Sequence, residues 1–484
     1  MRTETKDLRT RTLWDALAVL MPLFFAFGRT IGFPALERVF FYGVFIDRLF
    51  FSALTIVLLF RRVLRRKTES RFTKHFLVFA GMMVFWIAYG AAGVALSPYS
   101  YLWEGGKDCF YLLRGLCILY CMYEVLDTRR RTELFLTSLR LICAGLVLLG
   151  LWEIFAGWHF AVSRYDPMPI LTVDGRRRLA GLCFERLFLA TGPFFNENNL
   201  GTFLTIFAPL FFFSADLRPG RAALRFAYLI ALSFLLRVDD ATICSMALLA
   251  GLLAYVILVR RNWLRKALMA GGILLIYTRA ANWLAQLLVR LKEQLSIGIT
   301  GEELFSRAGV KTPYYILARI PSETDTEISL ASSLAQEMTT GTHSGPVRYR
   351  IQITLDSLDA FLESKGLGLG PNGYAVYIQT HQGGRSGYVN PHNWWLEVLS
   401  QYGIPVFAAY LASILWLYVS LIRAYLKNHD ELYAATVAMC TAFVVACVAP
   451  SSYIRETYQW VLPALCIVLL RQHETPRGEE TPML

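Results

Sequence analysis

Long apolar runs separated by shorter polar segments dominate the pattern of residues along this chain of 484 residues. Most runs have about twenty residues, the length that an α-helix needs to cross the hydrocarbon core of a bilayer. The pattern predicts an all-α polytopic membrane protein with about twelve transmembrane helices. The expected spans are residues 13–32, 39–60, 74–95, 108–126, 134–157, 194–214, 222–237, 241–259, 264–285, 403–423, 432–450 and 454–471.

Two polar segments exceed ordinary loop length and divide the chain. Residues 1–285 hold the first nine predicted transmembrane helices, with an outer loop near 158–193. Residues 286–402 are long enough to fold as a large extracytoplasmic helical loop domain. Residues 403–471 form the last three transmembrane helices, and residues 472–484 form a cytoplasmic tail.

The predicted loop domain has a pattern of its own. Glu302–Ile320 and Arg348–Leu362 carry apolar residues at helical spacing. In the second segment the apolar face consists of Ile351, Leu355, Leu358, Ala360 and Leu362, and Asp356, Asp359 and Glu363 lie on the other side. Ser322–His343 is rich in Ser, Thr and Glu, which predicts a mobile linker or lid. Gly366–Gly373 contains too many glycines for a helix and predicts a tight, backbone-exposed turn.

Composition and charge agree with a membrane protein. Hydrophobic residues make up 55% and charged residues 17%, and the mean hydropathy is +0.43, too apolar for a soluble protein of this length. Most of the net charge of +12 lies in basic clusters at 61–67, 129–131 and 260–266, all on one side of the predicted membrane. This positive-inside distribution predicts cytoplasmic termini and excludes a nucleic-acid partner. The first span is too long for a cleavable signal peptide, and the nine cysteines lack zinc-ligand spacing, so we expect no disulfide and no metal.

Charged residues inside the predicted spans gather toward the outer face. They are Arg29, Asp47, Arg48, Arg114 and Glu153. A charge at the bilayer centre is costly, so such residues pair with one another or face a water-filled cavity. Two compatible interpretations follow: an ion pair between Arg29 and Asp47 across a short hairpin, or a polar cavity open to the outside.

The border between the loop domain and the span at 403 carries the strongest candidate for chemistry. Here the chain reads Asn390-Pro391-His392-Asn393-Trp394-Trp395. His392 is suited to accept a proton near neutral pH, and Asn393 can hold a sugar or phosphate oxygen. A lone histidine is more often structural, but its place at this border favours a reaction site at the membrane surface. The two tryptophans predict an interfacial anchor.

Polar residues also gather at the outer end of the span that begins near residue 194. Asn196, Asn198 and Asn199 are costly to place in lipid, so they must face protein or water. They form either a satisfied helix cap or a substrate-facing surface. Arginines on the same predicted face suit phosphate, because the planar guanidinium donates two hydrogen bonds at once. They are Arg237, Arg348, Arg350, Arg385 and the run Arg176–Arg178.

Several of these motifs occur in one order along the chain. Asn196-Glu197-Asn198-Asn199-Leu200-Gly201 is followed by Arg350, by Gly368-Leu369-Gly370-Pro371-Asn372-Gly373-Tyr374 and by His392-Asn393. This succession resembles the O-antigen ligase and O-antigen polymerase superfamily over residues 190–425. The stretch Pro391–Ile404 is especially similar to polymerases and ligases of Gram-positive teichuronic-acid-type polymers.

The resemblance implies a metal-independent and cofactor-free glycosyltransferase on the outer face of the bacterial cytoplasmic membrane. Its implied partners are an undecaprenyl-diphosphate-linked saccharide donor, a glycan or glycolipid acceptor, and the lipid bilayer. His392 would be the general base or a hydrogen-bond donor to the diphosphate, and Arg350 would hold the diphosphate. The resemblance assigns substrate binding to Asn393, Arg348, Asn196, Asn198, Asn199, Gly368 and Gly370.

One departure concerns a second arginine. The family commonly has Ser-Arg-Gly where this chain reads Val238-Asp239-Asp240, and Arg237 just upstream is the candidate replacement. The motifs do not separate a polymerase from a ligase. A transporter or flippase of lipid-linked saccharides is the main alternative, and a structural or sensor membrane protein is the third. The chain lacks the two related halves that many transporters show.

Overall fold

The computed structural model describes residues 2–32, 45–64, 72–164, 187–212, 219–259, 346–450 and 452–474, with a few isolated positions between 271 and 291. These residues form thirteen α-helices and two 3-10 helices, so the all-α prediction is confirmed within the described part of the chain. The helices are α1 (Arg2–Phe27), α3 (Ile46–Leu64), α4 (Lys74–Leu96), α5 (Leu102–Val125), α6 (Arg129–Ala156), α7 (Glu197–Phe207), η1 (Ala208–Phe211), α8 (Pro219–Val238), α9 (Thr242–Leu258), α14 (Pro346–Glu363), α15 (Gly373–Thr380), α16 (Trp394–Asn428), α17 (Glu431–Ala446), η4 (Thr457–Trp460) and α18 (Val461–Glu474).

Every predicted span except 264–285, which lies almost wholly outside the described residues, overlaps a helix. By length and composition alone, three of the described helices can cross a membrane: α4, α6 and α16. Three shorter apolar helices are Thr12–Phe27, α9 and α17. The span expected at 194–214 is the 11-residue α7 followed by a 3-10 turn, because Pro209 interrupts the helix. The count of twelve crossings and the outer location of the loop domain therefore remain predictions.

Helix boundaries follow from local capping chemistry. Thr73, Thr128 and Asp430 precede α4, α6 and α17, and each side-chain oxygen accepts a hydrogen bond from a backbone N–H of the first turn. α16 begins nine residues before the predicted span at 403, because Asn393 caps it in the same way. The segments Glu302–Ile320 and Ser322–His343 lie outside the described residues.

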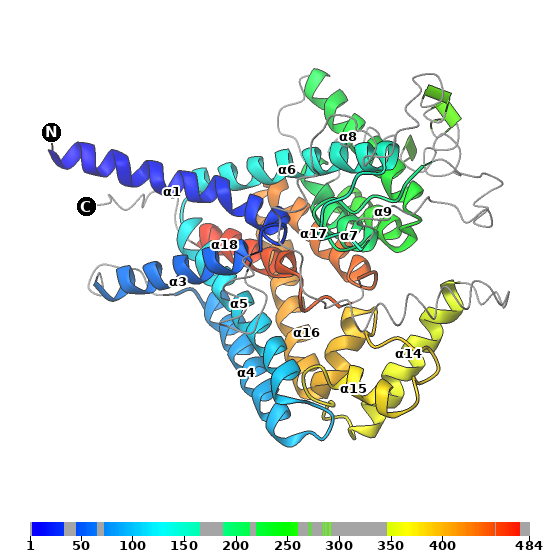
Figure 1. Cartoon of the computed structure of the whole chain (residues 1–484). Helices are drawn as coiled ribbons and strands as arrows, with labels where there is room; N and C mark the ends of the chain where they lie inside the picture. Colours follow the sequence, from blue (N-terminus) through cyan, green and yellow to red (C-terminus); the bar gives the residue numbers. More distant parts are fainter. Residues whose placement is uncertain are drawn as a thin grey trace, which may run out of the picture.

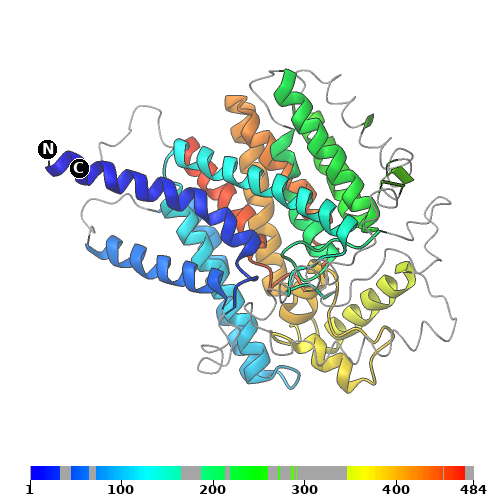
Figure 2. The same ribbon diagram turned by 45° about the horizontal axis from the view of Figure 1, so that its top comes forward.

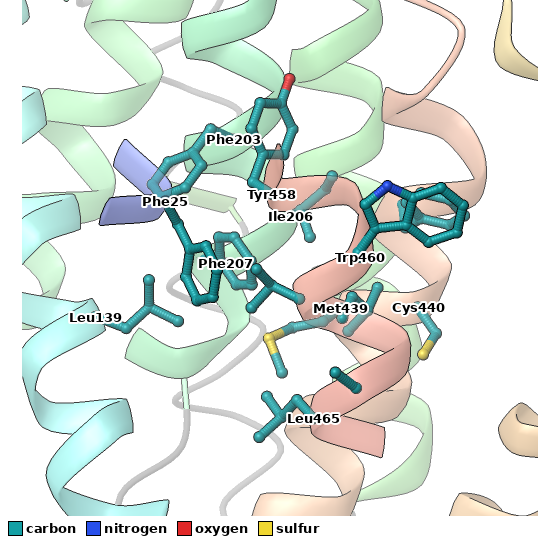
Figure 3. Close-up of a cluster of buried hydrophobic side chains, with 14 of the residues drawn as sticks. Phe25, Leu139, Phe203, Ile206, Phe207, Met439, Cys440, Tyr458, Trp460 and Leu465 are labelled. Carbon is teal, nitrogen blue, oxygen red and sulfur yellow. The ribbon is translucent and has the colours of Figure 1, made fainter. Parts of the chain in front are cut away.

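The helices share one continuous apolar core. α17 packs on α9, α1 on α6, and α4 on both α5 and α16 (Figures 1 and 2). Figure 3 shows part of this core, where the ring centroid of Phe203 from α7 lies 5.3 Å from that of Tyr458, and where Phe207, Trp460 and Leu465 belong to the same cluster. Trp460 reaches this position because it lies against Gly115 of α5, where a Cβ atom would stand 2.6 Å from its ring.

The glycine turn between α14 and α15 is tight, as predicted, but its backbone is not exposed. Leu369 N donates to Ser400 O at 2.9 Å, and Gly370 N donates to Gln401 O at 2.8 Å. Ile404 N in turn donates to Gly366 O at 2.9 Å. These bonds join the turn to a kink in α16, where Gly403 has φ 69° and ψ −172°. We call this contact the turn–kink contact.

Candidate functional site

The turn before α16 holds His392 in an uncommon conformation. Its φ is +48°, in the left-handed region that non-glycine residues seldom occupy. Pro391 before it is buried. Asn393 after it caps α16, because its Oδ1 accepts hydrogen bonds from Trp395 N at 3.0 Å and Leu396 N at 3.4 Å. Strain of this kind persists where the surroundings over-determine it, and it is frequent at functional sites.

The two tryptophans after Asn393 do not behave as one anchor. Trp394 is 1% exposed, and its Nε1 donates to the Tyr410 hydroxyl at 3.3 Å. Its ring packs among Trp86, Tyr453 and Trp460. The interfacial-anchor interpretation is therefore wrong for Trp394, which is a core residue. Trp395 is half-buried, and its Nε1 donates to Val444 O at 3.1 Å.

Two arginines from distant parts of the chain lie close enough to His392 to act on its charge. Burial first, then the charges of Arg350 and of Arg164, lower the pKa of His392 to about 3. The ring of Tyr388 meets the imidazole edge-on, with centroids 5.3 Å apart. The site therefore brings His392 and Arg350 together, as the motifs predict. It adds Arg164, which the sequence analysis missed because a single arginine beside a long loop has no distinguishing pattern.

Contacts with neighbouring backbone position both arginines. Arg350 lies in the first turns of α14, and its Nη1 donates to Val448 O at 2.9 Å. Burial lowers the pKa of Arg350, and the thiol of Cys244 acts in the opposite direction. The backbone N of Arg164 donates to Phe195 O at 2.8 Å, which sets this arginine beside the asparagine segment.

The asparagines divide between capping and pairing. Asn196 caps α7, because its Oδ1 accepts from Asn199 N at 2.9 Å. Asn199 Nδ2 donates to Glu456 Oε1 at 3.0 Å. The satisfied-cap interpretation is thus confirmed for Asn196. Asn198 is half-buried, and its carbonyl accepts from the Cys244 thiol at 4.0 Å. Contact of these residues with substrate remains a prediction.

Arg237 is buried in the last turn of α8, but it is not one of the charges that act on His392 among the described residues. It lies beside Asp239, whose Oδ1 accepts from Ala190 N at 2.8 Å and whose pKa burial raises. The role of Arg237 as the replacement arginine remains a prediction. The side chain of Arg348 and the whole run Arg176–Arg178 lie outside the described residues.

The structure gives Gly368 and Gly370 a packing role. A Cβ atom on Gly368 would stand 2.5 Å from Gly403 N, and one on Gly370 would stand 2.8 Å from Ser100 Cβ. Gly368 N donates to Ser364 Oγ at 2.9 Å, and Gly370 N is used in the turn–kink contact. These N–H groups are therefore engaged within the protein, and substrate binding by either glycine stays a prediction that no contact supports.

The predicted pair between Arg29 and Asp47 is wrong. Arg29 Nη1 instead pairs with Glu456 Oε1 at 2.8 Å. Asp47 Oδ2 accepts from Thr457 Oγ1 at 2.9 Å and lies 3.6 Å from Arg114 Nη1. Glu456 and Thr457 belong to one stretch near the C-terminus, residues 452–457, which we call the clamped segment.

α16 also holds the clamped segment. Glu397 Oε1 accepts from Ser452 Oγ at 2.6 Å, and Glu397 Oε2 accepts from Tyr453 N at 2.8 Å. Arg114 Nη2 of α5 donates to Arg455 O at 2.7 Å. Charged and polar side chains from five other parts of the chain therefore hold this segment beside the site.

Comparisons with known proteins agree with the motifs. Residues 226–411 match the family model described as O-antigen ligase, a range that includes Arg237, Arg350 and His392. The chain is also 21% identical over 461 residues to the teichuronic acid biosynthesis protein TuaE of Bacillus subtilis (strain 168), covering 92% of this chain and 82% of that protein. Together these matches confirm the predicted resemblance of the chain to the O-antigen ligase and O-antigen polymerase superfamily.

Proposed function

We propose that the chain is a membrane glycosyltransferase that moves a saccharide from an undecaprenyl-diphosphate carrier to a sugar hydroxyl. The match to the O-antigen ligase family and the similarity to a teichuronic acid biosynthesis protein support a role in making a cell-surface polysaccharide. The reaction is placed at the outer face of the bacterial cytoplasmic membrane, with both termini cytoplasmic. This orientation rests on the positive-inside distribution of the basic clusters.

The observation that carries the proposal is that Arg350 and Arg164 both lie close enough to His392 for their charges to lower its pKa. A lipid diphosphate leaves with growing negative charge, and fixed guanidinium groups stabilise that charge. The acceptor oxygen forms a bond to the anomeric carbon while the bond from that carbon to the phosphate oxygen breaks. The lipid diphosphate leaves with the electron pair, and His392 takes the hydroxyl proton.

The electrostatics of the site link donor binding to base strength. With a pKa of about 3, His392 is neutral but weakly basic in the free enzyme. A diphosphate bound beside Arg350 and Arg164 offsets their positive charge, which raises the pKa of His392. The base therefore becomes stronger once the donor is in place.

Release of the lipid diphosphate tests the proposal directly. Purified protein in detergent is incubated with an undecaprenyl-diphosphate oligosaccharide, and free lipid diphosphate and glycan products are measured. We expect release by the wild type and loss of release in His392→Ala and Arg350→Ala. Arg385→Ala is the matched control, because Arg385 is an exposed arginine that pairs with Asp359 at 2.8 Å.

The products separate the possible reactions. Elongated glycan identifies a polymerase, and transfer to a different acceptor identifies a ligase. Full activity in both His392→Ala and Arg350→Ala would overturn the site. Binding of the donor without release in the wild type would favour transport of lipid-linked saccharides over glycosyl transfer.

A further inference from the structure

α14 presents its two faces in an unusual way. Its inward side is buried: Ile353, Asp356, Ser357 and Ala360 are 4%, 3%, 1% and 0% exposed. Its outward side is large and apolar: Ile351, Leu355, Leu358 and Leu362 are 55%, 41%, 38% and 67% exposed. Asp356 lies on the other side of the helix from the leucines, as predicted, but Ala360 lies with Asp356 on the buried side, so its predicted place on the leucine face is wrong. We call the four outward residues the α14 stripe.

Hydrogen bonds on the inward side fix this orientation. Asp356 Oδ1 accepts from Arg385 N, and Asp356 Oδ2 accepts from Ser386 N, each at 2.9 Å. A buried carboxylate that accepts two backbone N–H groups cannot rotate toward solvent without leaving both donors unpaired. The helix therefore cannot roll to bury its leucines and expose Asp356.

The α14 stripe is narrow and continuous. Its residues are spaced four, three and four apart, so they project within about 60° of one another on a helix of 3.6 residues per turn. From Ile351 to Leu362 the stripe extends about 16 Å at 1.5 Å per residue. A soluble helix places such a stripe against the core.

The stripe continues onto a helix that can cross the membrane. α14 packs along the N-terminal half of α16 (Figures 1 and 2). After the stripe come Leu367, 61% exposed, and Ile404 of α16, 55% exposed. Ile404 N donates to Gly366 O at 2.9 Å, so the end of α14 and the kink of α16 lie at one level. Beyond the kink, Leu415, Val419 and Leu426 of α16 are also exposed.

We propose that α14 is an interfacial helix whose stripe lies in the acyl chains of one leaflet of the bilayer. A helix with a leucine face and a polar opposite face binds a membrane in this way, parallel to the surface. The occupant of the stripe is lipid, because exposed apolar residues continue from α14 through Leu367 and Ile404 to Leu415 and Val419 of α16, a helix that is long and apolar enough to span the bilayer.

The position of α14 bears on the donor, and this step rests on the proposed function. Arg350 immediately precedes Ile351, the first residue of the stripe. A helix that lies at the level of the lipid headgroups therefore holds Arg350 where the diphosphate of a lipid-linked donor lies. The stripe sets the depth of this arginine, so it is a positioning element and does not itself touch the reacting atoms.

Spin labels at neighbouring positions test the location of the stripe independently of activity. Leu362→Cys and Glu363→Cys differ by one residue and by about 100° around the helix. Each variant is labelled with a nitroxide and reconstituted into vesicles of phosphatidylethanolamine and phosphatidylglycerol. Oxygen, which concentrates in lipid, and a water-soluble nickel chelate then report collision rates by electron paramagnetic resonance. The labelled wild type provides the background from its own cysteines.

At position 362 we expect the collision rate of the nitroxide with oxygen (the oxygen effect) to exceed its collision rate with the nickel chelate (the nickel effect) several-fold. At position 363 we expect the nickel effect to be the larger. A nickel effect equal to or larger than the oxygen effect at 362 would overturn the proposal. Low accessibility to both reagents would overturn it as well, because it would mean that protein covers the stripe, either another segment or a second copy. Leu358→Cys repeats the measurement if Leu362→Cys does not fold.

Enzyme kinetics then test the link to the donor. In Leu362→Glu we expect the KM for a donor with a full-length prenyl chain to rise about tenfold, while the KM for a short-chain, water-soluble donor stays unchanged. An equal rise for both donors would contradict the positioning role. A wild type that is inactive on both donors but keeps the oxygen–nickel contrast would refute the proposed function and leave the membrane contact standing.

Discussion

Substitution of Gly403 by alanine tests how strongly the turn–kink contact stabilises the protein. Gly403 has φ 69° and ψ −172°, a combination that side-chain-bearing residues almost never adopt. An added Cβ atom would also stand 2.5 Å from both Gly366 O and Leu367 O. Neither oxygen belongs to a flexible side chain, so the backbone itself must move.

The expected loss combines two terms. The backbone conformation costs about 1–3 kcal/mol for a residue with a side chain. Overpacking against fixed atoms costs about 1–3 kcal/mol more. We therefore expect Gly403→Ala to lower the free energy of unfolding by about 4 kcal/mol. Displacement of Gly366 also weakens its hydrogen bond from Ile404 and releases the segment that leads back to α14.

The effect is measured as the Tm of thermal unfolding in detergent. Unfolding is monitored with a thiol-reactive dye that reacts with the buried cysteines as they become exposed. Gly387→Ala is the matched control, because Gly387 has a similar φ of +73° but no atom within 4 Å of the added Cβ. Its expected cost is the backbone term alone, about 1–2 kcal/mol. Equal losses in the two variants would refute the role of close packing, and an unchanged Tm in Gly403→Ala would refute both terms.

Three further predictions concern charge. Because the pKa of His392 is about 3, kcat/KM, which reports the free enzyme, should fall on the acid side only below pH 5. The acid fall of kcat, which reports the enzyme with bound donor, should lie at a higher pH, because the diphosphate offsets the charges of the arginines. If both parameters fall at the same pH, donor binding does not raise the pKa of His392. As the pH falls, the unfolded chain protonates His392 near pH 6.5, whereas the folded protein does so only near pH 3. The contribution of His392 to stability is therefore complete above about pH 6.5 and is lost as the pH falls toward 3. This pH dependence should vanish in His392→Gln. Arg29→Met should lower the free energy of unfolding by about 3 kcal/mol, because it leaves the buried carboxylate of Glu456 without its cation. The control Arg385→Met removes an exposed pair worth less than about 1 kcal/mol in the same denaturation assay, and equal losses would count against the buried pair.

The sequence predicts the helices well because membrane spans depend on a strong local signal, a run of apolar residues. It also predicts that His392 and Arg350 lie together, because their motifs keep an order and spacing that a known family shares. Their meeting in the structure depends on α14 and α16 packing side by side, which no periodicity encodes.

Other features depend on long-range contacts and could not be predicted. Arg29 lies near Asp47 in sequence, yet it pairs with Glu456, 427 residues away. The periodicity of α14 shows that the helix has two faces but not which one meets protein. The glycine turn was recognised as a turn, but its burial depends on acceptors in α16.

The clamped segment has a consequence for the order in which the protein is assembled. Asp47 receives its hydrogen bond from Thr457, 410 residues later in the chain. At about 5–20 residues per second, roughly 20–80 s separate the synthesis of these two residues. On the predicted topology, the spans that carry Arg29, Asp47 and Arg114 enter the membrane during that interval, before their C-terminal partners exist. The N-terminal helices therefore stay in an unfinished state until the clamped segment is made, and a ribosome that stops before Glu456 leaves a product that quality-control proteases can recognise by the missing carboxylate partner of Arg29.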